Sequence, residues 1–171
     1  MLDPRLSQDT IAAIATPPGD GGVGIIRISG PRARDIARAM FRPSNPAFTD
    51  FLPYRLHYGH VADANGAHLD DVLCAYMPGP RSYTGESLIE INCHGGRAVL
   101  GAVLQEALDH GARLAERGEF TYRAFMNGRM DLSQAEAVAE MIHAPTKAAM
   151  HLAQVKLSGL LGDKIAELRG L

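Results

Sequence analysis

Hydrophobic and polar residues alternate along much of the first three-quarters of the chain, which predicts a mixture of strands and helices. Apolar runs bounded by glycine or proline predict strands over residues 11–16, 25–29, 56–62, 68–77 and 88–93, with a short strand near Leu114. Asn65 and Gly66 separate two of these runs and predict a hairpin, because both tolerate positive φ. Residues 19–24 predict a turn and residues 43–53 a loop. Apolar positions three or four apart predict one helix over residues 33–41 and another between Gly96 and Gly111.

The last quarter of the chain carries helical periodicity alone. Residues 118–127 predict one or two helical turns closed by Gly128, and Ser133 with Glu136 forms a capping-box pattern that predicts a helix start. Pro145 interrupts this helix, and a last helix is expected to run to the C-terminus. Its apolar stripe is expected to lack a partner helix of comparable length in the chain; the stripe comprises Met150, Ala153, Leu157, Leu160, Leu161, Ile165 and Leu168. The sequence therefore predicts an α+β fold that belongs to a longer protein or pairs with another chain.

Composition limits the class of protein. The chain has 171 residues, of which 46% are hydrophobic and 21% charged, with a formal net charge of −2. These values are typical of a globular protein and exclude a disordered chain, a membrane-spanning chain and a highly basic nucleic-acid coat. The first residues lack the basic and apolar layout of a secretory signal. Cys74 and Cys93 fall inside predicted strands, so they are interpreted as buried thiols of a cytoplasmic protein, with no zinc-ligand spacing.

Two glycine-containing motifs have alternative interpretations. Gly19, Gly21 and Gly24 match the dinucleotide-binding fingerprint, but that fingerprint needs a helix after its last glycine, and here a strand is predicted. A turn whose backbone lies close to a partner or ligand is favoured, and no phosphate-binding P-loop motif follows any glycine run. The run His94–Gly96 predicts a tight strand-to-helix turn, and its N–H groups are also able to meet an anionic ligand group.

Charged residues inside predicted strands are the most informative candidates for function. Arg27 lies between Ile26 and Ile28, and Glu90 lies between two further isoleucines. A charge in a central strand costs free energy unless it is paired or exposed. The two residues therefore indicate an exposed sheet face, an internal ion pair, or a polar ligand site. In a ligand site the carboxylate accepts neighbouring N–H donors and the guanidinium holds an anionic or polar edge, with Arg129 as a further cation.

Four long blocks of the sequence resemble one protein family. They are residues 9–30, 78–86, 90–96 and 117–137, and they occur in the order that the family has. The chain is similar over these blocks to the N-terminal portion of the bacterial tRNA modification GTPase MnmE (TrmE) family, and the last block is the most specific. The resemblance extends from about Asp9 to the end of the chain.

The resemblance implies a domain organisation and a fold. It implies that residues 1–127 form a tetrahydrofolate-binding and dimerisation domain with an aminomethyltransferase-like fold. Residues 128–171 are then the first helices of an all-α domain, and the GTPase domain inserted in that domain lies beyond Leu171.

The resemblance also implies an activity, partners and site residues. With the FAD-dependent partner MnmG (GidA), the parent protein is expected to form 5-carboxymethylaminomethyluridine at the tRNA wobble position, driven by GTP hydrolysis with K⁺ and Mg²⁺. The family's contacts to 5-formyl- or 5,10-methylenetetrahydrofolate fall on Arg27, Glu90 and Arg129, where many relatives carry lysine in place of Arg129. A homodimer in the cytoplasm is expected, and the fragment itself is expected to lack catalysis. A ligand-free dimerisation module and a dinucleotide-binding enzyme are the alternatives.

Overall fold

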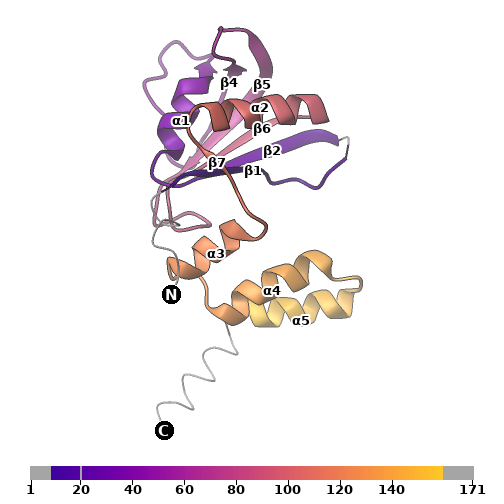
Figure 1. Cartoon of the computed structure of the whole chain (residues 1–171). Helices are drawn as coiled ribbons and strands as arrows, with labels where there is room; N and C mark the ends of the chain where they lie inside the picture. The colour runs from indigo at the N-terminus through magenta and orange to yellow at the C-terminus, as the bar shows by residue number, and fades with distance from the viewer. Residues whose placement is uncertain (1–8, 20, 160–171) are drawn as a thin grey trace. The chain divides into compact units, whose positions relative to one another are not determined.

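The computed structural model describes residues 9–19 and 21–159 of the chain (Figure 1). The chain divides into two compact units, Met1–Arg117 and Gly118–Leu171. The division falls before the boundary expected after residue 127, because helix α3 groups with the helices that follow it. The extent of the predicted folate-binding region stays a prediction. No helix within the described ranges is both long and apolar enough to cross a bilayer.

The first unit is built on one mixed sheet. Its described elements, in chain order, are β1 (Ile11–Ile14), β2 (Gly21–Ser29), α1 (Ala33–Met40), β3 (Phe41–Pro43), β4 (Leu56–Ala62), β5 (His68–Met77), β6 (Leu88–Gly95), α2 (Arg97–Asp109) and β7 (Arg113–Leu114). The strand order over these described residues is β3-β4-β5-β6-β2-β1-β7, and only the β1–β7 pairing is parallel. Helices α1 and α2 lie on one side of the sheet (Figure 1). The mixture of strand and helix predicted from the sequence is confirmed.

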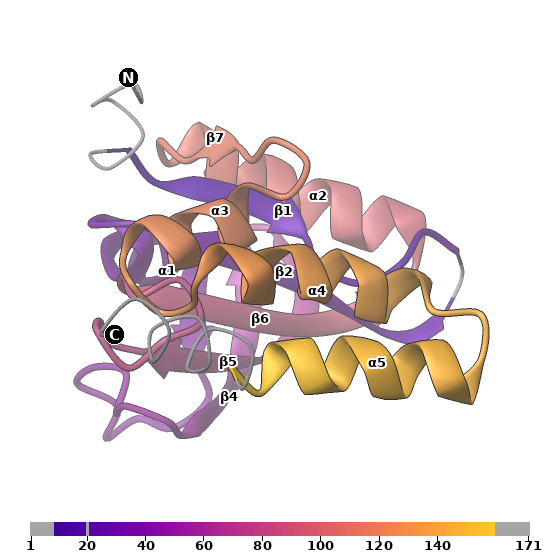
Figure 2. The same ribbon diagram turned by 90° about the horizontal axis from the view of Figure 1, so that it is seen from below.

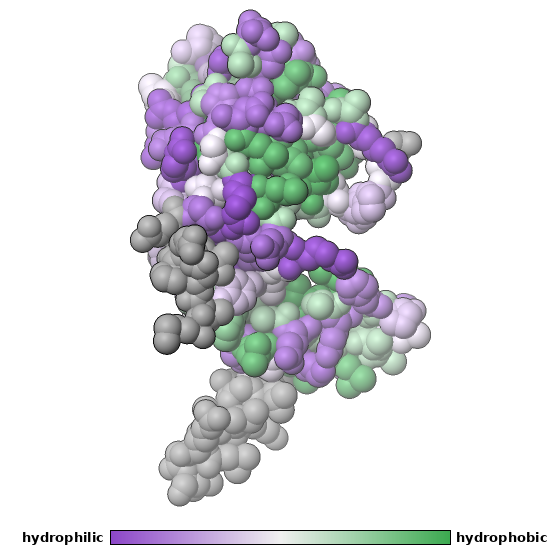
Figure 3. All heavy atoms as spheres, viewed as in Figure 1, coloured by the Kyte–Doolittle hydropathy of each residue, from purple (hydrophilic) through white to green (hydrophobic). Residues whose placement is uncertain are grey.

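The core lies between the sheet and the two helices. Ile26, Ile28, Ile89 and Ile91 are fully buried and pack with side chains of α1 and α2, because alternate residues of a strand face the same side. Cys74 and Cys93 lie in the same core as free, buried thiols, as predicted. We call the opposite side of the sheet, which carries Ile25, Arg27, Glu90, Asn92, Leu73, Tyr58 and Leu56 by the same alternation, the outer face. Hydrophobic side chains also reach the surface of this unit alongside α2 (Figure 3).

Two local predictions for this unit are corrected by the structure. The stretch 19–24, predicted as a turn, already joins the sheet at Gly21, where β2 pairs with Gly95 and carries an irregularity in register before Gly24. The loop predicted over residues 43–53 begins later than expected, because Phe41–Pro43 forms strand β3 against β4. A three-residue strand that ends in proline has no periodicity of its own, so the long-range pairing alone creates it.

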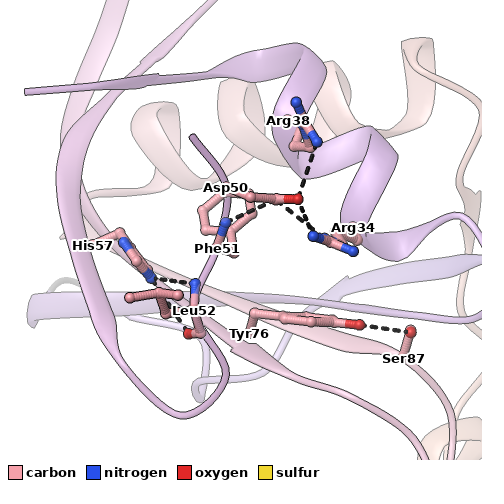
Figure 4. A network of polar contacts seen from close by, with 8 residues as sticks. All are labelled: Arg34, Arg38, Asp50, Phe51, Leu52, His57, Tyr76 and Ser87. Carbon is pink, nitrogen blue, oxygen red and sulfur yellow. Dashed lines mark hydrogen bonds and ion pairs between the residues drawn. The ribbon is translucent and has the colours of Figure 1, made fainter. Parts of the chain in front are cut away.

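Ion pairs hold the segment between β3 and β4 against α1 (Figure 4). Asp50 accepts hydrogen bonds from Arg34 and from Arg38, and its Oδ1 also accepts from the backbone N–H of Phe51 over 2.8 Å. Phe51 is buried against Phe41 and Phe48, with ring centroids 5.3 and 5.2 Å away. These contacts order a long connection that the sequence predicts only as a loop.

The second unit contains helices α3 (Glu119–Met126), α4 (Leu132–His143) and α5 (Lys147–Leu157). Helix α4 begins earlier than predicted: Asp131, and not Ser133, is its N-cap, and Asp131 with Gln134 forms the capping box. The expectation of a last helix without a partner is wrong for the described part, because α4 and α5 are of similar length and lie side by side (Figures 1 and 2). Gln134 donates to the carbonyl of Leu157, and Lys156 pairs with Glu140 across the two helices. The four stripe residues from Leu160 to Leu168 lie outside the described residues.

A glycine in β2 gives a matched test of the packing between sheet and helix. A Cβ atom at Gly24 would lie 2.5 Å from Cδ2 of the buried Leu100 in α2, whereas one at Gly22 would meet nothing within 4 Å. We expect Gly24→Ala to lower the free energy of unfolding by about 1–3 kcal/mol through overpacking. Gly22→Ala is the control and should change it by less than about 0.5 kcal/mol. Denaturant unfolding measures both, and equal stabilities of the two variants would contradict the packing.

The corrected helix start of α4 can be tested by removing its cap. Asp131→Ala removes the side chain that accepts from the backbone N–H of Gln134 over 2.8 Å. We expect it to destabilise the first turn of α4 by about 1 kcal/mol, measured by hydrogen exchange of the amides in that turn. Ser133→Ala removes only the bond from its hydroxyl to Asp131 and should cost less. A larger loss in Ser133→Ala would restore Ser133 as the cap.

Candidate functional site

Arg27 and Glu90 lie side by side on the outer face of the sheet. The antiparallel register of β2 with β6 places them directly opposite one another. Nε and Nη2 of Arg27 donate hydrogen bonds to Oε1 of Glu90 over 2.9 and 2.6 Å. The two side chains are 26% and 24% exposed, so the pair lies within reach of solvent. An ion pair was one of the three alternatives that the sequence allowed for Arg27 and Glu90, and the structure contains it. The pair remains accessible to a ligand.

The carboxylate of Glu90 has capacity left for further hydrogen bonds. Both bonds from Arg27 reach the same oxygen, Oε1, and within the described parts of the chain Oε2 accepts none. A carboxylate oxygen accepts about two hydrogen bonds, and Oε2 is not among the buried, unsatisfied atoms. The pair therefore presents a fixed negative oxygen beside a fixed guanidinium, which suits a ligand with neighbouring N–H donors and an anionic or polar group.

Arg129, the third residue predicted for the site, belongs to the second compact unit. It follows α3, and its backbone N–H donates to the carbonyl of Ala124 over 2.8 Å, after Gly128 at a φ of 67°. Helix α3 thus ends just before the glycine that predicts its end from the sequence, because Gly128 adopts the left-handed conformation common after a helix. Arg27 and Glu90 are brought together within the first unit, whereas Arg129 belongs to the second.

A shallow cavity of about 320 Å³ lies on the outer face, one pleat along from Glu90. Its lining includes Asn92, Leu73, Tyr58, Val23 and His94. The amide nitrogen of Asn92 donates to the carbonyl of Leu73 over 3.1 Å. Asn92 is not among the residues predicted from the sequence for the site, although its two-residue spacing from Glu90 is the signal that places both on one face.

His94 is held by a carboxylate at the end of β6. Its Nδ1 lies 2.7 Å from Oδ1 of Asp70, and its backbone N–H donates to Oδ2 of the same residue over 2.7 Å. Asp70 is 9% exposed and His94 70% exposed at the side chain. The hydrogen bond to Asp70, and then its negative charge, raise the pKa of His94 above the ordinary histidine value. The imidazole is thereby oriented with Nε2 away from Asp70.

The remaining sequence candidates have structural roles. The residues after Gly24 continue β2, so no helix N-terminus follows the glycine run to hold a pyrophosphate, as predicted. Gly96 is the N-cap of α2, which fits the tight strand-to-helix turn. Burial raises the pKa of the Cys93 thiol to about 11, and it also raises the pKa of Cys74, so both remain protonated thiols at neutral pH. Across the described ranges, no group of three or more His, Cys, Asp or Glu side chains is placed to hold a metal ion.

The pKa of His94 gives a test of its contact with Asp70. Because the folded-state pKa is raised, the contact favours folding below the ordinary histidine pKa, and this contribution is lost as pH rises through the raised value. We expect Asp70→Asn to lower the pKa of His94, measured by NMR titration of its ring protons. Asp71→Asn is the control and should lower the pKa of His94 less. Asp71 acts on His94 by charge alone, and its effect is the smallest of those that shift this pKa. An unchanged pKa in Asp70→Asn would contradict the contact.

Comparison with known proteins gives consistent results over nearly the whole chain. It is 62% identical over 162 residues to a "tRNA modification GTPase MnmE" of Nitratidesulfovibrio vulgaris, covering 95% of this chain and 35% of that protein. Proteins of the same name from Lawsonia intracellularis and Clostridioides difficile are 52% and 53% identical, over 94% and 95% of this chain and 35% of each of them. The chain thus spans about a third of the length of the curated relatives it matches.

A family model matches the region that contains all three predicted site residues. The model describes the N-terminus of the GTP-binding protein TrmE, and it covers residues 10–129. This match includes the whole sheet, both helices packed on it, and helix α3. Together with the identity to the relatives, it agrees with the resemblance seen in the four sequence blocks. The chain therefore belongs to the tRNA modification GTPase MnmE (TrmE) family, of which it matches the N-terminal part.

Proposed function

We propose that this chain is the folate-binding, N-terminal part of a protein that modifies tRNA. The observation that carries the proposal is the accessible Arg27–Glu90 pair on the outer face. Oε2 of Glu90 suits the neighbouring N–H donors of a pterin ring, and the guanidinium of Arg27 suits a polar ring edge or a carboxylate tail. The proposed ligand is 5-formyl- or 5,10-methylenetetrahydrofolate, bound on an aminomethyltransferase-like fold.

Arg129 is proposed as the second cation of the folate site. Its support comes from the sequence block that it shares with the family, because residue 129 is the last position of the matched family region. A guanidinium at this position suits the carboxylates of the glutamate tail of a folate.

The outer face also supports a homodimer. Leu56, Tyr58 and Leu73 are 62%, 56% and 39% exposed, and Tyr58 lies directly opposite Leu73 in the register of β4 and β5. Neighbouring exposed apolar side chains on a sheet face are typical of protein–protein contact. We propose that a second copy of this chain covers part of this face.

The activity proposed for the parent protein rests on the names of its relatives and on the family resemblance. In the proposal, the parent hydrolyses GTP with K⁺ and Mg²⁺ in a domain outside this chain. Working in the cytoplasm with the FAD-dependent protein MnmG, it forms 5-carboxymethylaminomethyluridine at the tRNA wobble position. The chain itself contributes the one-carbon donor and the dimer contact, and it has no catalytic role.

Calorimetric titration with 5-formyltetrahydrofolate tests the folate site. We expect the chain to bind, and Glu90→Ala and Arg27→Ala each to weaken binding about tenfold or more, because each removes charge-assisted hydrogen bonds to the ligand. Arg38→Ala is the matched control and should bind as the unchanged chain does. Arg38 is a half-exposed arginine of α1 that pairs with Asp50.

Unchanged affinity in both site variants would refute the site assignment. A chain that is dimeric by light scattering but gives no heat with folate would favour the ligand-free dimerisation module. A chain that binds NAD but not folate would favour the dinucleotide-binding alternative.

A further inference from the structure

The connection between β5 and β6, residues 78–87, folds back onto the outer face beside the Arg27–Glu90 pair. Ser29, two residues beyond Arg27 in β2, is fully buried and donates a hydrogen bond to Oε2 of Glu86 over 2.8 Å. Its hydroxyl also lies 2.7 Å from that of the fully buried Thr84. Because Ser29 has one proton, which it donates to Glu86, the hydroxyl of Thr84 is the donor in the second bond. The connection is therefore fixed to β2 by one buried and one partly buried hydrogen bond.

Further hydrogen bonds restrain the connection 78–87 on both sides of Thr84. The hydroxyl of Ser82 donates to the carbonyl of Glu86 over 2.6 Å, and the backbone N–H of Gly30 donates to the carbonyl of Ser87 over 3.0 Å. Ser87 also lies 3.3 Å from the hydroxyl of Tyr76 on the neighbouring strand (Figure 4). These contacts leave residue 83, between Ser82 and Thr84, little freedom to move relative to β2.

The fixed connection places an aromatic ring on the proposed site. Cζ of Arg27 lies over the ring of Tyr83, 5.4 Å from its centroid. Two contacts of different kinds act on Arg27 here, among the others that it makes: the carboxylate of Glu90 binds its Nε and Nη2, and the ring of Tyr83 lies against its guanidinium plane. A guanidinium favours this geometry because the face of an aromatic ring is electronegative. An arginine so held loses less rotamer entropy when it binds a ligand.

We propose that Tyr83 is a positioning residue of the folate site and acts through Arg27. The inference rests on the proposed function and adds to it a residue from the segment 78–87. Tyr83 holds the guanidinium in the orientation that keeps Oε1 of Glu90 occupied and directs Oε2 towards the ligand. Its ring, and not its hydroxyl, performs this role.

A double-mutant cycle tests the inference on the whole chain. Calorimetry with 5-formyltetrahydrofolate is performed on the unchanged chain, Tyr83→Ala, Tyr83→Phe, Arg27→Ala, and the variant with both alanines. We expect Tyr83→Ala to weaken binding about three- to thirtyfold, and Tyr83→Phe to stay within about twofold because the ring is retained. In the Arg27→Ala background, Tyr83→Ala should cause no further loss, because its effect passes through Arg27.

A measurement without ligand separates this inference from the proposed function. The NMR signal of the Arg27 Nε–H should shift and exchange faster in Tyr83→Ala and remain unchanged in Tyr83→Phe. Leu114→Ala is the control, since it removes an exposed side chain from β7, at one edge of the same sheet, and it should leave the signal in place. Thermal unfolding of each variant confirms that the chain is folded.

The possible outcomes separate the two hypotheses. No folate binding by the unchanged chain refutes the proposed function, and an unchanged Arg27 signal in Tyr83→Ala refutes the positioning by Tyr83. Equal losses of affinity in Tyr83→Phe and Tyr83→Ala would assign the role to the hydroxyl and overturn the inference. The inference would also be overturned if Tyr83→Ala weakened folate binding as much in the Arg27→Ala background as it does in the unchanged chain.

Discussion

The antiparallel pairing of β2 with β6 is the constraint on which the rest of the first unit depends. It joins residues 63 positions apart in the sequence and sets which side chains face α1 and α2. In the observed register Ile26, Ile28, Ile89 and Ile91 enter the core, and Arg27 meets Glu90 on the outer face. A slip of either strand by one residue would turn its charge into the core, where burial of an unpaired charge costs several kcal/mol.

The charged pair adds little to stability, which is compatible with the proposed role in binding. A pair that is about a quarter exposed contributes about 0–1 kcal/mol to folding. Two aliphatic side chains on neighbouring strands would pack at least as well there. Both charges lie on the face that carries the buried Ser29–Thr84 hydrogen bond, and Arg27 stacks on the ring of Tyr83. Side chains held in a fixed orientation in this way suit the ligand site proposed for them.

The sequence predicted best those elements whose periodicity is strong. The hairpin 56–62 and 68–77 and the buried faces of α1 and α2 agree with the structure, because each repeats its own pattern over several residues. The start of α4 was misplaced because Asp131–Gln134 and Ser133–Glu136 both match the capping-box pattern, two residues apart. The extended backbone at Asp131, with a ψ of 174°, decides between them. Strand β3 was missed because only its pairing with β4 defines it.

The sequence by itself determined that Arg27 and Glu90 occupy strands between isoleucines, because the two-residue period of a strand fixes which neighbours share a face. It also determined the family, through four blocks in a fixed order, and hence the choice of Arg129. Only the tertiary structure decided that Arg27 and Glu90 are partners, that Oε2 of Glu90 accepts no hydrogen bond from residues 9–19 or 21–159, and that Tyr83 stacks on Arg27. These contacts depend on strand register and on the path of the connection 78–87, and both are set by hydrogen bonds between residues far apart in the chain.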